Sequence, residues 1–202
     1  MAHIPDGLLS LPVTLAGGVL AAAALAATAR RLHEDELPRV AVMAAVFFVA
    51  SLVSVPMGPT SIHLILSGLM GVIIGWATVP AVFVGLVLQA AFFGFGGFVA
   101  LGVNTVNIAM PGAVLAALAA PLLRRGTPLR AGLVAAAVGA LSVAATGLLV
   151  MAALWASDQA YALSASVMLL SYVPLALAEA VLSGVAVTFL ARVKPELLGR
   201  KP

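Results

Sequence analysis

Long apolar runs, separated by short charged clusters, follow one another along the whole chain of 202 residues. A membrane-spanning helix needs about 20 mainly apolar residues, and this pattern is typical of a helical bundle in a membrane. Seven such segments are predicted, at about 8–29, 40–56, 61–76, 78–94, 104–123, 131–156 and 165–191. The third and fourth are short, with a tight turn expected near Trp76–Pro80. The apolar and polar alternation of a membrane barrel is missing from the sequence. We therefore predict an all-α, polytopic membrane protein in which residues 1–202 form one domain.

The positions of lysine and arginine predict how the bundle is oriented. They follow the first, fifth and seventh segments: Arg30, Arg31 and Arg39, then Arg124, Arg125 and Arg130, then Arg192, Lys194, Arg200 and Lys201. With seven segments all three clusters fall on one side, and Lys and Arg favour the cytoplasmic side. The prediction is an outward N-terminus and a cytoplasmic C-terminus in the cell inner membrane.

Composition narrows the classes of function. Only 8% of the residues are charged, whereas a soluble domain carries about 25%. The net charge of +3 comes from clusters between apolar runs, which indicates topology and predicts no nucleic-acid partner. The lack of cysteine excludes thiolate metal sites and thiol catalysis. No cleavable signal peptide is recognised, so we expect the N-terminus to be kept.

The N-terminal residues Met1-Ala-His-Ile-Pro-Asp-Gly contain a histidine close to the chain end. An initiator Met before a small residue such as Ala2 is usually removed, as it is before the glycine of a myristoylation signal. The terminal amine of Ala2 would then join the amide and imidazole of His3, leaving one planar position open. If Met1 is retained, its amine completes a set of four nitrogens. Such ligation favours Ni(II) or Cu(II). The alternative is that His3 belongs to a frayed tail.

A second histidine follows Thr60 and Ser61, which are natural helix N-cap residues. We expect His63 in the first turn of the third helix, on the same outer side as His3. Histidine is rare inside membranes and is a functional candidate there, although a packing histidine bonded to a carbonyl is the alternative. The sequence predicts a joint site of His3 and His63. His33 lies in a cytoplasmic loop and is expected to be solvated.

Further polar residues are expected around this site. Asn104 and Asn107, three residues apart on one helix face, are predicted to brace it, with Ser61 and Asp6 lining it. Asp6 either draws cations in or holds the N-terminal loop. Glycines between residues 94 and 102 permit a tight loop at membrane depth, and the neighbouring phenylalanines are expected to cover the site.

Glu179 is the only acid well inside an expected helix. An intramembrane carboxylate usually faces the bundle interior. It would relay protons, neutralise a cation, or bond to serine and backbone groups. We favour the structural role.

Four motifs carry a resemblance to a known family. They are His3-Ile-Pro-Asp-Gly-Leu-Leu-Ser, Pro59-Thr-Ser-Ile-His63-Leu, Phe93-Gly-Phe-Gly-Gly and Leu101-Gly-Val-Asn-Thr-Val-Asn-Ile. Together they resemble the CbiM/NikM family, the substrate-capturing membrane subunits of energy-coupling-factor transporters for cobalt and nickel. The resemblance covers most of the chain and is more generic after about residue 130.

The resemblance implies seven helices, an N-terminal segment plugged into the bundle, and square-planar nitrogen ligation. The implied ligands are the terminal amine, the amide and imidazole of His3, and the imidazole of His63. The family usually begins Met-His, so Ala2 departs from the pattern unless Met1 is removed. Co²⁺ or Ni²⁺ is the implied transported ligand, and no catalytic cofactor is expected.

The resemblance also implies partners: a transmembrane coupling subunit, a pair of cytoplasmic ATPases and often a small accessory membrane protein. The chain lacks a P-loop and is not expected to be an enzyme. Two other interpretations stay open. A self-contained secondary transporter would use Glu179 as a proton carrier. An intramembrane metal-dependent enzyme would need a general base and an H-E-x-x-H motif, which the sequence lacks.

Overall fold

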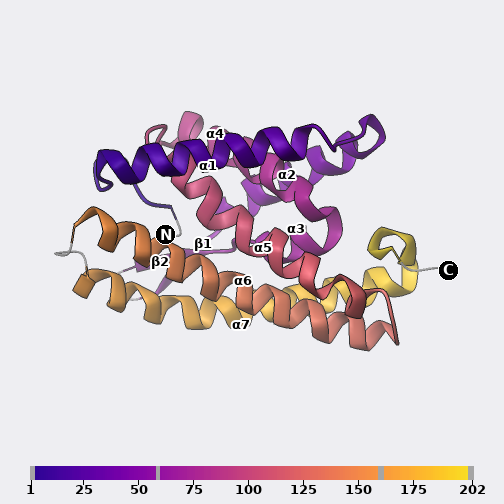
Figure 1. Ribbon diagram of the computed structural model, residues 1–202. Helices are drawn as coiled ribbons and strands as arrows, with labels where there is room; N and C mark the ends of the chain where they lie inside the picture. The colour runs from indigo at the N-terminus through magenta and orange to yellow at the C-terminus, as the bar shows by residue number, and fades with distance from the viewer. Residues whose placement is uncertain (1–2, 58–59, 159–161, 200–202) are drawn as a thin grey trace.

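A computed structural model describes residues 3–57, 60–158 and 162–199, and in 54–57, 60–62 and 162–171 it describes the backbone alone. Its main elements run roughly side by side along one direction (Figure 1). The α-helices are α1 Leu11–Ala29, α2 Leu37–Leu52, α3 Ser67–Ile74, α4 Thr78–Phe93, α5 Leu101–Leu123, α6 Pro128–Ser157 and α7 Ala162–Val193. Short 3-10 turns are η1 Glu34–Glu36, η2 Gly75–Ala77 and η4 Pro195–Leu198, and two strands are β1 Ser54–Met57 and β2 Thr60–His63.

Five stretches of the described chain are long and apolar enough to cross a membrane. They are Leu11–Ala29, Ser67–Phe93, Leu101–Leu123, Pro128–Ser157 and Tyr172–Val193. The prediction of a helical, multi-pass membrane protein is therefore confirmed. Helix α2 has 16 residues and rises about 24 Å, less than the roughly 30 Å of a hydrocarbon core. Seven complete spans remain a prediction.

The predicted second and third helices are wrong around residues 53–66. Helix α2 ends at Leu52 and α3 begins at Ser67, and an antiparallel hairpin lies between them. Its paired residues are Ser54 with His63, Val55 with Ile62, Pro56 with Ser61 and Met57 with Thr60. A proline inside a helix loses a hydrogen bond and clashes with the preceding turn, and the β-branched residues here favour extended backbone. Thr60 and Ser61 thus belong to a strand, and His63 is its last residue.

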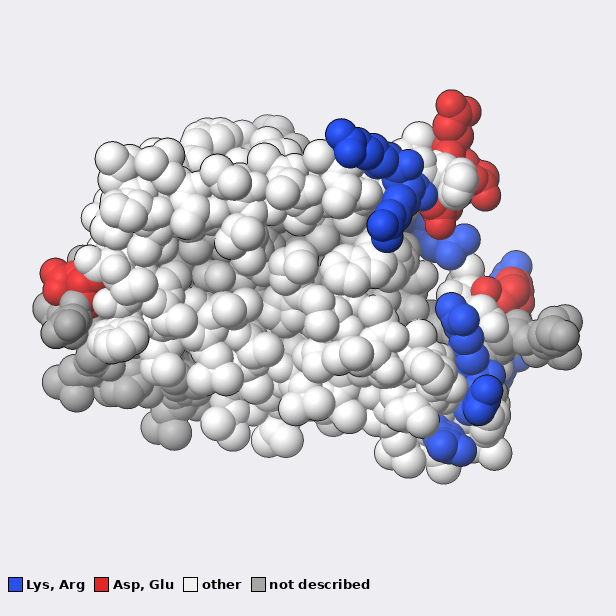
Figure 2. All heavy atoms as spheres, viewed as in Figure 1, with Lys and Arg blue, Asp and Glu red and all other residues white. Residues whose placement is uncertain are grey.

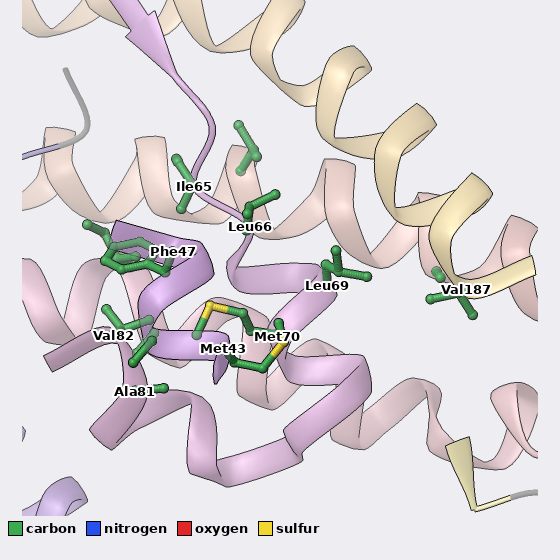
Figure 3. Packing of buried hydrophobic residues seen from close by; sticks show 14 of the residues in the cluster. Met43, Phe47, Ile65, Leu66, Leu69, Met70, Ala81, Val82 and Val187 are labelled. Atoms are coloured by element: carbon green, nitrogen blue, oxygen red, sulfur yellow. The ribbon is translucent and has the colours of Figure 1, made fainter. Parts of the chain in front are cut away.

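The chain crosses from β2 into α3 through a short irregular segment. Figure 3 shows Ile65 and Leu66 in this segment, just before α3 begins. Both side chains are buried, and Leu66 has φ 55°. It is the only residue other than glycine with a positive φ in the described chain. Irregular backbone at membrane depth is tolerated where protein covers it, and the buried side chains of Ile65 and Leu66 show that protein covers this segment.

The expected turn between the third and fourth segments is formed by η2, and α4 already begins at Thr78. Gly75 adopts φ 56° there. This turn shares a cavity lining with Arg124 and Gly199, so α3 runs from the β hairpin toward the basic end of the molecule. Helix α4 returns to Gly94 and the loop that packs on the N-terminal segment.

The helices pack closely around one main core. It includes Ile108 of α5 and Val143 of α6. It also includes Phe47 of α2, Met70 of α3, Val82 of α4 and Val187 of α7, which are labelled in Figure 3. A methyl group added to Gly68 of α3 would lie 2.7 Å from the Cα of Gly139 in α6. Small residues permit such backbone approach in lipid. A second, smaller cluster packs Ile4 against Val103 of α5.

On the face shown in Figure 2, the charged side chains lie at the ends of the bundle. Figure 2 shows the Lys and Arg side chains of this face at the end where α1, α5 and α7 finish in Figure 1. His33 is exposed, with its backbone N–H bonded to Glu36. The middle of the molecule presents an uncharged surface in the same view.

Candidate metal centre

The two histidines that the sequence singles out lie against each other. His3 precedes α1 and His63 ends β2, 60 residues apart in the chain. Their ring centroids are 4.9 Å apart and the ring planes differ by 14°. Both side chains are buried, with 5% and 6% of their surface exposed. The N-terminal segment is therefore folded into the bundle, and the frayed-tail alternative does not describe it.

Three ring nitrogens of this pair have no hydrogen-bond partner within the described structure. They are both nitrogens of His3 and Nε2 of His63. The Nδ1–H of His63 donates to the Leu64 carbonyl at 3.2 Å. Because a carbonyl only accepts, Nδ1 carries the proton and Nε2 keeps a free lone pair. A buried polar atom without a partner costs about 1–3 kcal/mol, so this site has the chemistry of one that binds a ligand.

The surroundings keep both rings neutral. Burial, the neighbouring His63 ring and the positive N-terminal amine together lower the pKa of His3 from 6.5 to about 3. Burial also lowers the pKa of His63, against the opposing effect of its bond to Leu64. Metal ions bind neutral imidazole, so proton competition at these rings is weak near neutral pH.

Asn104 clamps the N-terminal segment onto α5. Its Oδ1 accepts the Ile4 N–H at 2.9 Å, and its Nδ2 donates to the Ile4 carbonyl at 3.0 Å. The Asn104 amide thus bonds both backbone groups of Ile4, as a neighbouring β-strand would do. It is 1% exposed, so both bonds are shielded from water.

Asp6 fixes the same segment at a second point. Its carboxylate accepts the N–H groups of Ala100 at 2.8 Å and Val99 at 3.3 Å, just before α5 begins. A negative charge is favourable at a helix N-terminus. A methyl group added to Gly97 would lie 2.2 Å from the Asp6 carboxylate, and φ at Gly97 is +90°. Of the two roles considered for Asp6, these contacts favour holding the loop.

The structure describes the other predicted site residues only in part. Asn107 is buried one turn beyond Asn104, and its Nδ2 lacks a partner in the part of the chain described. The backbone of Ser61 pairs with Pro56, while its side chain lies outside the description. Met1 and Ala2 lie outside the described residues.

The phenylalanines do not cover the histidines as expected. Phe92 is 71% exposed and Phe98 is 60% exposed. Phe48 of α2 packs against Phe92 and Phe93, with ring centroids 6.5 Å and 6.0 Å apart. Phe92 and Phe93 are exposed because they lie in the last turn of α4, where residues 91–94 are all exposed. The backbone of the glycine loop covers the site instead, since a methyl group on Gly96 would lie 3.4 Å from His3 Cβ.

Glu179 lies in α7 and is fully buried. Its Oε1 accepts the N–H groups of Ile65 at 2.5 Å and Leu66 at 2.7 Å. The sequence indicates a buried role for this acid, but it gives no sign of its partners, which are about 110 residues away. Within the described residues, no three side chains of His, Cys, Asp or Glu gather together.

Helical packing and the buried histidine pair place the chain in the class of multi-pass membrane proteins with imidazole nitrogens in their interior. The family model for the cobalt uptake substrate-specific transmembrane region, CbiM, matches residues 3–197. The chain belongs to the CbiM family. It is thus a transmembrane component of cobalt and nickel uptake, and it is not an enzyme.

Individual relatives agree with this assignment. The chain is 37% identical over 200 residues to a Haemophilus influenzae protein named for metal transport, covering 98% of this chain and 97% of the relative. A fused nickel transport protein, NikMN, of Rhodobacter capsulatus is 41% identical over 131 residues, which are 61% of this chain and 38% of the relative. A crystal structure titled as a transition metal transporter has the same fold, with a TM-score of 0.78 at 24% identity. That match covers 95% of this chain and 93% of the other.

Proposed function

We propose that this chain captures Co²⁺ or Ni²⁺ at its N-terminus and delivers the ion to an ATP-driven importer of the energy-coupling-factor type. The observation that carries the proposal is the buried pair of His3 and His63, with three ring nitrogens that lack a partner in the described chain. Neutral imidazoles shielded from water suit Ni, Co, Cu and Zn, and not Mg or Ca.

The ligand set combines these rings with the chain end. With Met1 removed, the amine of Ala2, the amide and imidazole of His3 and the Nε2 of His63 supply four nitrogens. Metal–nitrogen bonds are about 2.0–2.1 Å long, so nitrogens around one ion lie about 3–4 Å apart. Ring centroids 4.9 Å apart bring one nitrogen of each histidine within this range after modest ring rotation. With Met1 retained, His63 becomes unnecessary or axial.

The site faces outward in this proposal. The lysines and arginines visible in Figure 2 lie at the other end of the molecule, and the side that carries them faces the cytoplasm. We assign one crossing to α2 and one to α3, each completed by part of the β hairpin that joins them, so that the number of crossings is odd. Capture then takes place on the side from which an importer receives its ion.

The proposed partners are a transmembrane coupling subunit, two cytoplasmic ATPases and, in many members, a small accessory membrane protein. Membership of the CbiM family supports them. The names of the relatives support either cargo, because the family is described for cobalt and the Rhodobacter capsulatus relative for nickel.

Metal analysis of the purified protein tests the capture site. We expect about one Ni²⁺ or Co²⁺ per chain, and a large loss in both His3→Ala and His63→Ala. His33→Ala is the matched control, because it removes the same ring from an exposed position far from the site. Unchanged metal content in His3→Ala and His63→Ala would exclude the proposed ligands.

Uptake into proteoliposomes tests the mode of energy coupling. Reconstitution with a coupling subunit and ATPases is expected to give metal uptake that requires ATP. A secondary transporter would instead carry the ion alone, driven by a proton gradient. Uptake by the isolated chain under a proton gradient, abolished in Glu179→Gln, would favour that alternative.

A further inference from the structure

A buried carboxylate holds the backbone directly after the proposed ligand His63. Glu179 of α7 accepts two N–H groups with a single oxygen, Oε1. The donors belong to Ile65 and Leu66, two and three residues after His63. This is the point where β2 has ended and α3 has not begun, so neither element supplies partners for these amides.

The same two residues lie in the most unusual backbone of the bundle. Leu66 adopts φ 55°, a left-handed conformation that is unfavourable for a residue with a side chain. Its carbonyl begins α3 by accepting the Met70 N–H at 2.8 Å. Strained backbone persists where surrounding contacts determine it, and at Leu66 the contacts are the Glu179 bond and a buried side chain.

Glu179 is well placed to hold this segment. It has no exposed surface, and its Oε2 finds no partner among the described residues. Its neighbours are tightly packed: a methyl group on Gly139 of α6 would lie 2.9 Å from the Glu179 carbonyl oxygen. The close approach of α6 fixes the position of this turn of α7, and the Glu179 carboxylate joins the turn to the segment after His63.

We propose that Glu179 is a positioning residue for metal capture, which anchors the break between β2 and α3 so that His63 faces His3. The inference rests on the proposed function, because it assumes that His63 is a ligand. Glu179 touches no ligand atom and acts through the backbone of Ile65 and Leu66. In this role it needs an acceptor oxygen at the right place, and it needs no proton exchange.

Three substitutions separate the geometry from the charge. Glu179→Gln keeps an oxygen acceptor at the same reach and is expected to bind Ni²⁺ within about threefold of the unchanged protein. Glu179→Asp keeps the charge but withdraws the oxygens by one carbon, and Glu179→Leu removes them. Both are expected to weaken binding by about 10- to 100-fold, the effect of losing two hydrogen bonds. Ser183→Ala is the control, since it changes another buried polar group one turn along α7 and should leave the affinity unchanged.

A spectroscopic readout distinguishes positioning from general stability. The Cu²⁺ electron paramagnetic resonance spectrum of Glu179→Asp is expected to resemble that of His63→Ala, because both have lost the same ligand. In the His63→Ala background, Glu179→Asp should weaken binding no further. Full affinity in both Glu179→Asp and Glu179→Leu, or an equal additional loss in the His63→Ala background, would overturn the inference.

The proposed function fails in a different way. If His3→Ala and His63→Ala keep their metal, the capture site is wrong, whatever the Glu179 variants do. If those two lose their metal while Glu179→Asp binds normally, only the positioning role is wrong.

Discussion

Replacing Asn104 with leucine removes both hydrogen bonds that hold the backbone of Ile4 on α5. The leucine fills a similar volume, so the change acts mainly on these bonds. Each loss leaves a buried backbone group without a partner, at about 1–2 kcal/mol when the segment can partly turn to water. Together the two losses destabilise the state in which the N-terminal segment lies on α5 by about 2–4 kcal/mol. At 1.4 kcal/mol per tenfold change, the Ni²⁺ affinity should fall by about 30- to 700-fold.

The assay is a competition titration of the purified protein against a chromophoric chelator, with the thermal unfolding temperature measured in parallel. Gln89→Leu is the matched control. It also replaces a buried amide side chain with leucine, but in α4, where the Nε2 of Gln89 donates to Ser51 Oγ at 2.6 Å and not to the N-terminal segment. We expect this control to keep its affinity within a few-fold. Equal affinities for Asn104→Leu and the unchanged protein, or equal losses in the two variants, would refute the clamp.

Three further predictions follow from the same geometry. Gly97→Ala should weaken Ni²⁺ binding at least tenfold, because its methyl group would displace the Asp6 carboxylate; Gly94→Ala shares the positive φ but meets open space, so an equal loss there would contradict the clash. The His3 pKa is lowered to about 3, so the folded state binds fewer protons than the unfolded state between about pH 3 and 6.5. The free energy of unfolding should therefore fall as the pH drops through this window, by at most about 1.4 kcal/mol per pH unit. In His3→Gln the unfolding temperature should depend less on pH. Identical profiles in the two proteins would argue against a buried neutral ring. Adding two residues ahead of Ala2 moves the amine away from His3 and should weaken binding by more than tenfold, with the start of each form checked by mass spectrometry; unchanged affinity would remove the amine from the ligand set.

Much of the bundle can be predicted from sequence because lipid imposes a simple rule. Every backbone polar group must be satisfied inside a helix or a closed sheet, so apolar length alone marks helices such as α5 and α6. The candidate metal ligands were also recognisable, because histidine is conspicuous in so apolar a chain. Their side-by-side placement depends on contacts that no local pattern contains.

The errors lie where tertiary contacts override the apolar pattern. The stretch around Pro56 and Thr60 joins two apolar runs, yet it forms a hairpin, and Glu179 accepts the N–H groups of Ile65 and Leu66 that follow it. The exposure of Phe92 could not be predicted either, because the backbone at Gly96, and not a phenylalanine ring, lies against His3. The sequence could not predict that Glu179 bonds to Ile65 and Leu66. A carboxylate that accepts backbone N–H groups requires no particular side chain in its partners.

The central claim is that His3 and His63 bind one ion together with nitrogens of the N-terminus. Nickel K-edge X-ray absorption of the Ni²⁺-loaded protein tests it most directly. We predict about four nitrogen ligands in a planar arrangement, with scattering from two imidazole rings that falls to one ring in His63→Ala. A six-coordinate, oxygen-rich shell that is the same in the unchanged protein and in His63→Ala would contradict the claim.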